Sequence, residues 1–271
     1  MIDLPDLPRL LISAGPTREA VDAVRFLSNR SSGRMGVAIA AAAARRGWPT
    51  TLLLGPIGQM APGAIPDLVG IVRFESAAEL AAELTVRWPR HDILIMAAAV
   101  ADYRPVAVIE AGVRRCLADG GGAPDADRPA LRGSLGGGGK LVRGDGPLLL
   151  ELAPVPDILA AIAGATRPDQ ATVGFALEAG ELRERARSKL ARKSLDAIVA
   201  NPLPTMDSAA IEGWLLRADG SERHPPETRQ GKEEFAAWLL GEVEGLWRGK
   251  RAALGGRRTP ALRAGEGERS R

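Results

Sequence analysis

Short apolar runs alternate with amphipathic stretches along most of the chain. Stretches with helical periodicity, at 76–88 (SAAELAAELTVRW) and 181–193 (ELRERARSKLARK), lie between several of the runs. The runs are rich in Ile, Leu and Val and are RLLISAG (9–15), TTLLLG (50–55), GIVRF (70–74), DILIMAAAV (92–100), ATVGFAL (171–177) and LDAIVAN (195–201). Because continuous apolar strands between such helices are typical of buried parallel sheets, the pattern predicts an α/β fold with a mostly parallel sheet covered on both faces.

The C-terminal part follows a different pattern. Residues 210–225 (AIEGWLLRADGSERHP) predict a hairpin that turns at Ala218-Asp219-Gly220, and residues 232–247 (KEEFAAWLLGEVEGLW) predict a closing amphipathic helix. Residues 111–139 contain nine glycines and two prolines with almost no apolar periodicity, which favours a flexible insertion. We therefore expect a single α/β domain over residues 1–248, interrupted by this insertion.

Length and composition exclude several classes. A chain of 271 residues with 45% hydrophobic residues can bury the core of one large domain. Its longest apolar run is strand-sized, well short of the ~20 residues of a membrane span, and its first residues (MIDLPDLPRL) do not resemble a signal peptide. We expect a cytoplasmic protein that binds no membrane. Cys116, the single cysteine, allows no internal disulfide and is expected to be incidental, while His91 and His224 lack neighbouring metal ligands.

The net charge of +3 is unevenly distributed. From residue 249 to the end there are seven basic residues and two acidic ones, so this segment carries +5 and the remainder about −2. A segment of Gly, Ala and Arg without apolar periodicity predicts a basic disordered tail over 249–271. The rest of the chain does not favour nucleic-acid binding.

The segment from Leu11 to Ala40 carries the strongest chemical signal. It predicts a strand, then a loop rich in Arg, Asn and Ser, then a helix that opens at Ser31-Ser32-Gly33. Serines at a helix start can cap its free N–H groups, and a glycine lets a ligand approach the backbone. We therefore expect an anion site at this loop, although it is too poor in glycine for the usual dinucleotide motif.

Several motifs in a fixed order resemble the phosphopantothenate–cysteine ligase (phosphopantothenoylcysteine synthetase) family. They are SAGPTRE (13–19), RFLSNRSSGRMG (25–36), AAAVADYRP (97–105), GKLVRGDGPLLLELAPVPDIL (139–159), VGFALE (173–178) and KLARKSLDAIVAN (189–201). The resemblance covers nearly all of residues 9–248. It implies a Rossmann-like sheet and the stand-alone bacterial type of this family, without the flavin-dependent decarboxylase that is often fused before it.

The resemblance also implies the reaction. Bacterial members join 4′-phosphopantothenate to L-cysteine with CTP and Mg²⁺ through an acyl-cytidylate, in the coenzyme A pathway. It implies a homodimer, for which we expect the 211–225 hairpin to supply the contact, and a separate phosphopantothenoylcysteine decarboxylase as a further partner. The residues leave the choice between CTP and ATP open, although the bacterial type favours CTP.

Site roles are carried over by the resemblance onto matching positions. Asn29 would hold the acyl intermediate for attack by cysteine, and Lys140 would stabilise charge at the α-phosphate during acyl-nucleotide formation. Phosphopantothenate would be bound by Arg25, Asn29, Ser31, Ser32 and Gly33. Nucleotide contacts would come from Met96, Ala97, Ala98, Asp102, Pro156, Asp157, Ile158, Leu159, Phe175, Lys189 and Lys193. No cluster of side chains suggests a protein-held metal.

Two departures from the family pattern bear on these roles. Pro154-Val155 stands where the family commonly has Lys-Asn, so a polar contact would be lost there. The insertion makes the family lysine ambiguous, because Arg114 lies at the expected distance from Asp102, whereas Lys140 keeps the distance to the Pro156-Asp157-Ile158 segment. We prefer Lys140, since it retains a lysine on a loop that could close over the nucleotide.

Two alternatives remain at this stage. A nicotinamide-dependent reductase would need a Tyr-x-x-x-Lys pair, but the single tyrosine, Tyr103, is followed four residues later by Ala107. A paralogue that binds nucleotide without turnover is supported by the two departures alone.

Overall fold

The computed structural model of the chain describes residues 7–58, 61, 63–110, 140–141, 148–178, 180–205 and 208–255. The expected insertion at 111–139, with Cys116 and Arg114, lies outside these residues. No helix in the described ranges is long and apolar enough to cross a membrane.

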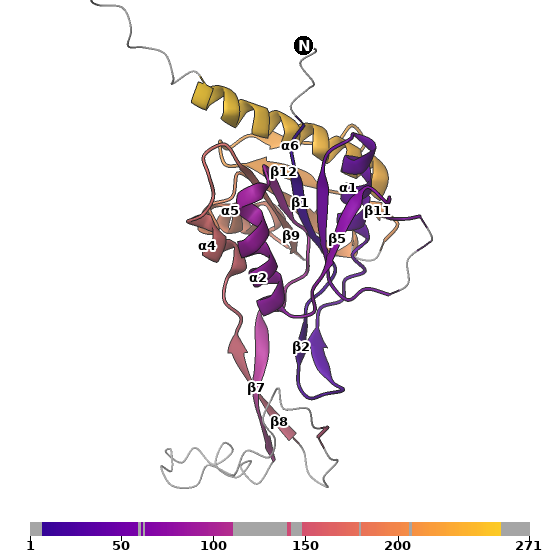
Figure 1. Cartoon of the computed structure of the whole chain (residues 1–271), viewed down its shortest axis with the longest axis vertical. Coiled ribbons are helices and arrows are strands. Elements are labelled where there is room, and N and C mark those ends of the chain that lie inside the picture. The colour runs from indigo at the N-terminus through magenta and orange to yellow at the C-terminus, as the bar shows by residue number, and fades with distance from the viewer. Residues whose placement is uncertain are drawn as a thin grey trace, which may run out of the picture.

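An eight-stranded sheet forms the centre of the molecule (Figure 1). Six strands run parallel in the order β5-β4-β1-β6-β9-β10, and β12 and β13 continue the sheet antiparallel beyond β10. These strands are β1 (Leu10–Ala14), β4 (Thr50–Leu54), β5 (Val69–Arg73), β6 (Ile93–Met96), β9 (Ala171–Glu178), β10 (Ala197–Pro202), β12 (Trp214–Arg217) and β13 (Glu222–Arg223). Numbered along the chain, the six parallel strands have the order 3-2-1-4-5-6 of the Rossmann fold, which confirms the predicted fold class.

Helices cover both faces of the sheet, as the apolar runs predicted. One core cluster joins the strands to α1 (Arg34–Arg45) and α6 (Lys232–Gly255). The other joins them to α2 (Ala77–Arg87), α4 (Ile158–Ala163) and α5 (Leu182–Arg192). Within β1, Leu10 and Ile12 face the first cluster and Leu11 the second, all fully buried, because successive side chains of a strand point to opposite faces.

Helix α1 packs unusually close to β1 and begins at a glycine. A Cβ at Gly36 would lie 2.5 Å from Ala14 Cβ, so only glycine permits this contact. The N-cap of α1 is Gly33, in the left-handed region at φ 69°, and no side chain caps the helix. The expectation that Ser31 and Ser32 cap α1 is therefore wrong, because the left-handed glycine turns the chain away before either hydroxyl can reach the first turn.

Two antiparallel ribbons extend from the sheet at the end opposite α6 (Figure 1). One pairs β7 (Tyr103–Glu110) with β8 (Leu148–Pro154), and the other pairs β2 (Arg18–Ala20) with β3 (Phe26–Ser28). The β7–β8 ribbon leaves the sheet directly after Asp102 and returns directly before Val155, where the Val155 N–H donates to the Asp102 carbonyl at 2.9 Å.

The C-terminal hairpin belongs to the main sheet. Strand β12 pairs with β10 and turns through Gly220 into β13, and Leu215 and Leu216 are fully buried. A short pair, β11 (Ala210–Ile211) with β14 (Gln230–Gly231), precedes α6. Helix α6 continues to Gly255, so the first seven residues of the expected tail are helical, and residues 256–271 lie outside the described part.

Candidate functional site

A cavity of about 860 Å³ lies at the carboxyl ends of β6, β9 and β10, against the start of α1. Ligands of open α/β sheets bind at this edge, where the strand order reverses. The cavity is lined by most of the expected site residues, namely Asn29, Ser31, Ser32, Gly33, Met96, Ala97, Ala98, Asp102, Pro156, Asp157, Ile158, Leu159, Phe175, Lys189 and Lys193. Five separate stretches of sequence thus meet in one place.

Hydrogen bonds join the end of β1 and the loop that follows it to the loop after β6, and they form the floor of the cavity. The Ser13 hydroxyl accepts from the Ala98 N–H at 3.2 Å, and the Thr17 hydroxyl accepts from the Ala101 N–H at 3.0 Å. Both side chains are fully buried. The SAGPT stretch therefore shapes the backbone of the AAAVAD stretch, a role that its sequence did not reveal.

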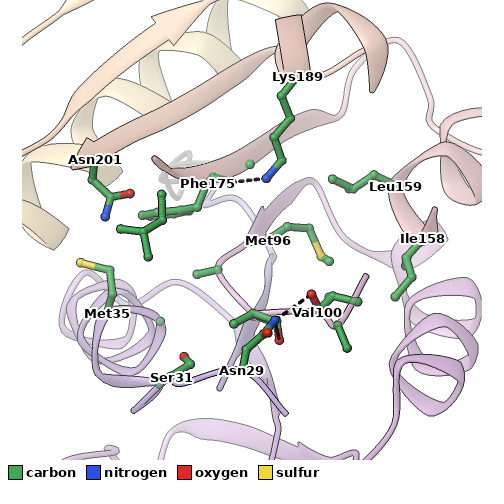
Figure 2. A pocket seen from close by; sticks show the side chains of 18 of the residues that line it. Asn29, Ser31, Met35, Met96, Val100, Ile158, Leu159, Phe175, Lys189 and Asn201 are labelled. Carbon is green, nitrogen blue, oxygen red and sulfur yellow. Dashed lines mark hydrogen bonds between the residues drawn. The ribbon is translucent and has the colours of Figure 1, made fainter. Parts of the chain in front are cut away.

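Asn29 is held at this floor by its amide group. Its Nδ2 donates to the carbonyl oxygens of Ala99 at 3.3 Å and Val100 at 3.0 Å, the latter drawn in Figure 2. Both Nδ2 hydrogens are therefore engaged with backbone, and within the described chain the side-chain oxygen has no partner. Asn29 can thus offer an acceptor, rather than a donor, to a bound ligand.

The backbone at the start of α1 closely approaches the β1 loop. A Cβ at Gly33 would lie 2.9 Å from Ile57 Cγ2 and 3.2 Å from the Gly15 nitrogen. The uncapped N–H groups of α1 face the cavity beside Ser31 and Ser32, which line it. A helix start of this kind favours negatively charged ligand groups.

Lys189 reaches into the cavity from α5. Its Nζ donates to the Phe175 carbonyl of β9, at 2.8 Å (Figure 2). Burial lowers the pKa of Lys189 below its ordinary 10.5, and Lys193 lowers it further, against the opposing effects of Glu178 and Asp102. The ammonium group is therefore poised for an anionic ligand, which would restore its preference for the charged form.

Asp157 links two elements at the opposite wall. It caps α4 by accepting from the N–H groups of Leu159 at 3.1 Å and Ala160 at 3.2 Å. Its carboxylate also lies 3.2 Å from Lys193 Nζ. Although burial alone raises it, the pKa of Asp157 is lowered on balance by the Ala160 N–H and by Lys193. Asp157 was expected to contact the nucleotide. The contacts that the structure describes for it are with Leu159, Ala160 and Lys193.

Arg25 and Lys140 are not among the described residues that line the cavity. Arg25 lies on the β2–β3 ribbon, forms an ion pair with Asp22, and its guanidinium reaches the Leu141 carbonyl at 3.4 Å. Lys140 is exposed and adjoins Leu141, whose N–H donates to the Asp22 carboxylate at 3.0 Å. The structure thus brings these two residues near each other but apart from the cavity wall.

The cavity wall also contains residues that the sequence did not single out. Glu178 follows Phe175 along β9, and Asn201 ends β10 beside Thr205. The position of Asn201 at a strand's carboxyl end was an available signal. In the described part, no group of three or more His, Cys, Asp or Glu side chains is arranged to hold a metal.

The family model for the DNA/pantothenate metabolism flavoprotein C-terminal domain matches residues 7–117 and 137–246. The chain belongs to this family. Similar proteins include the coenzyme A biosynthesis bifunctional protein CoaBC of Vibrio cholerae, 38% identical over 195 residues, covering 71% of this chain and 41% of that protein. CoaBC of Escherichia coli K12 is 35% identical over 240 residues, covering 86% and 51%.

A solved structure, that of the C-terminal domain of CoaBC, superposes with a TM-score of 0.65. It is 30% identical, and the match covers 89% of this chain and 96% of that domain. This chain spans about half the length, or less, of the curated relatives described above. The likeness therefore concerns the C-terminal domain of those bifunctional proteins.

Proposed function

We propose that this chain joins 4′-phosphopantothenate to L-cysteine in coenzyme A biosynthesis, using CTP and releasing pyrophosphate and CMP. The observation that carries the proposal is the convergence of the family motifs on one cavity at the switch point of the sheet. Membership of a family whose relatives include the C-terminal domain of a coenzyme A biosynthesis protein supports it.

In the first step, a carboxylate oxygen of phosphopantothenate attacks the α-phosphorus of CTP. The bond to the β-phosphate breaks and pyrophosphate leaves, which gives an acyl-cytidylate. Both reactants are anionic, so the step needs cations and directed N–H groups. Lys189, Lys193 and the uncapped start of α1 would supply them from two sides of the cavity.

In the second step, the cysteine amine attacks the acyl carbon, an amide bond forms, and CMP leaves as the amine loses a proton. The side-chain oxygen of Asn29 would accept a hydrogen bond from the attacking amine and orient its lone pair toward the carbonyl. This role follows from the use of both Asn29 donors by the floor.

Mg²⁺ fits the cavity as an ion carried on the triphosphate. Mg²⁺ usually keeps several waters and takes one or two protein oxygens together with substrate phosphates. Asp102 and Glu178 line the cavity near Lys189, whose pKa they influence, and their carboxylates would be the protein oxygens able to hold such an ion. The ion would neutralise phosphate charge.

We propose that the homodimer that the family implies forms through the β7–β8 and β2–β3 ribbons, while a contact through the 211–225 hairpin stays an untested prediction. Leu148, Leu150 and Leu152 alternate along β8 and are 48%, 37% and 42% exposed, and Phe26 on β3 is 46% exposed. An apolar row of this kind on a sheet face favours a partner surface, here a second copy. Light scattering of Leu150→Lys should give a monomer, whereas Leu68→Lys on another exposed surface should not.

The reaction is tested by pyrophosphate release from purified protein given phosphopantothenate, cysteine and each nucleotide in turn. We expect release with CTP and cysteine-dependent formation of the amide product. If none of the nucleotides supports pyrophosphate release, the ligase proposal is contradicted and a paralogue without turnover is favoured.

Two variants separate the half-reactions. Lys140 lies apart from the cavity wall and would reach the α-phosphate when its loop closes over the nucleotide, as the resemblance implies. In that case Lys140→Gln should lower acyl-cytidylate and pyrophosphate on the order of 10²-fold, the scale of losing one directed charge or donor. Asn29→Ala should act on the second step, and acyl-cytidylate should accumulate in quenched mixtures. Arg90→Gln, distant on the surface, is the control. Normal turnover by Lys140→Gln would transfer the role to Arg114.

A further inference from the structure

Asn201 carries a buried acceptor atom that the protein leaves unused. Its side-chain Oδ1 is buried and has no hydrogen-bond partner in the described chain. Its Nδ2 donates to the Thr205 hydroxyl at 3.1 Å, and that hydroxyl donates to the Pro202 carbonyl at 2.7 Å. A hydroxyl has a single hydrogen, so Thr205 can only accept from Asn201, and this fixes which end of the amide is oxygen.

A fixed, buried and unpaired acceptor is unfavourable unless a ligand supplies a donor. Asn201 lines the cavity, and Figure 2 shows its oxygen directed inward, toward Phe175. The atom therefore selects a ligand group that carries an N–H or O–H.

The surroundings of Asn201 suit a heterocyclic base. Phe175, Met35 and Ile211 give this side of the cavity an aromatic ring and apolar walls. Figure 2 shows Asn201 and Met35 on the side opposite Ile158 and Leu159. Lys193 is held at that opposite wall by Asp157, so this cation for a polyphosphate lies away from Asn201. A mostly apolar slot with one placed polar atom is typical of a base-binding pocket.

We propose that Asn201 determines nucleotide specificity by accepting a hydrogen bond from the exocyclic amine of the base. The inference rests on the proposed use of a nucleotide and identifies Asn201 as the residue that recognises its base. Cytosine presents a 4-amino group to the Asn201 oxygen, whereas uracil would present a 4-oxo group, so two acceptors would face each other. Adenine also carries an amine, so Asn201 selects amino bases over keto bases and does not separate CTP from ATP.

CTP and UTP form the matched ligand pair, since their bases differ only at this edge. Calorimetric titration of the full chain should show CTP binding on the order of a hundredfold more tightly than UTP, because a site built for a donor rejects the analogue that lacks it. Asn201→Leu, of similar size but without the acceptor, should bring the two affinities close together.

Thr205→Val provides the sharper test because Asn201 stays in place. Without the Thr205 hydroxyl the amide can rotate and offer Nδ2 to the uracil oxygen, so the preference for CTP should fall about tenfold or more. Thr85→Val is the control, since its hydroxyl bonds the Ala81 carbonyl within α2, far from the cavity.

Equal binding of CTP and UTP by the unaltered chain, binding of neither, or an unchanged preference in Thr205→Val would overturn the inference. If Asn201→Leu does not fold, Thr205→Val decides. Because binding is measured without turnover, a chain that prefers CTP but releases no pyrophosphate would contradict the ligase proposal while supporting the role of Asn201.

Discussion

The Lys193 ammonium lies 3.2 Å from the carboxylate of Asp157, which also caps helix α4. One side chain thus fixes the start of a helix and the position of a cation just beyond α5. Because α4 packs on α2 and Lys193 follows β9 and α5, this ion pair joins two parts of the fold at the cavity wall.

Substitutions of Asp157 should separate its two roles. Asp157→Asn keeps a good N-cap, so thermal stability should stay within a degree or two, whereas Asp157→Ala should lose about 1 kcal/mol of stability. Both variants release Lys193, and both should therefore change CTP affinity to the same extent. Thermal melts and titrations measure the two effects. Equal melting temperatures for the two variants would show that the cap contributes nothing.

The lowered pKa of Lys189 predicts that nucleotide affinity declines in alkaline solution at pH values below 10.5. A bound polyphosphate favours the charged lysine, so binding requires proton uptake once the pH exceeds the pKa of Lys189 in the free protein, which lies below 10.5. CTP affinity should therefore fall as the pH rises toward 10.5. Lys189→Arg, which stays charged, should make the decline shallower, and Lys250→Arg, in α6, should not. Identical slopes for all three proteins would exclude Lys189 from the effect.

Gly36→Ala should destabilise the protein by roughly 1–3 kcal/mol, the usual cost of overpacking. The new methyl group would meet Ala14 Cβ at 2.5 Å and the Ser13 carbonyl at 3.1 Å, so α1 must move away from β1. Gly241→Ala within α6 is the matched control, because its nearest atom is the end of Arg46 at 3.8 Å and alanine is the better helix former. Denaturant unfolding measures both. An unchanged denaturant midpoint for Gly36→Ala would mean that α1 and β1 leave room for a methyl group at this position.

Stability should decrease as the pH falls below about 6.5, the ordinary pKa of histidine. Burial lowers the pKa of His91, and Arg9 lowers it further, although hydrogen bonding to the Arg87 carbonyl opposes both. The neutral ring is favoured in the folded state, so its contribution is complete above pH 6.5 and is lost as the pH falls through the lowered value. His91→Gln should flatten this slope in urea titrations, whereas His224→Gln, which is exposed, should keep it. If His224→Gln flattens the slope and His91→Gln does not, the assignment of this pH dependence to His91 is wrong.

The strands and the cavity residues could be predicted from the sequence because each depends on a short, local pattern of residues. Apolar runs such as LLISA and ILIM become buried parallel strands, and motif residues at strand ends, such as Met96, lie where those ends meet. The sequence could not show that Ser31 and Ser32 leave α1 uncapped, since this depends on the left-handed φ of Gly33.

Hydrogen bonds that depend on the fold account for the features that the sequence did not predict. Glu19 belongs to the SAGPTRE stretch, and its buried carboxylate accepts from the Ala77 N–H at the start of α2, 58 residues away. The unused oxygen of Asn201 likewise depends on how Thr205 directs its single hydrogen. Neither pairing leaves a periodic trace in the sequence, because each depends on the folded path of the chain.

The floor built on Ser13 and Thr17 makes ligand recognition inseparable from folding. Its hydrogen bonds join residues more than 80 positions apart, so the floor forms only when β1 and β6 are both folded and paired. A population in which β1 or β6 has unfolded should therefore lose the floor and, with it, nucleotide binding. In rising denaturant, loss of nucleotide binding and loss of the sheet should be the same event, and saturating ligand should shift both to the same higher concentration.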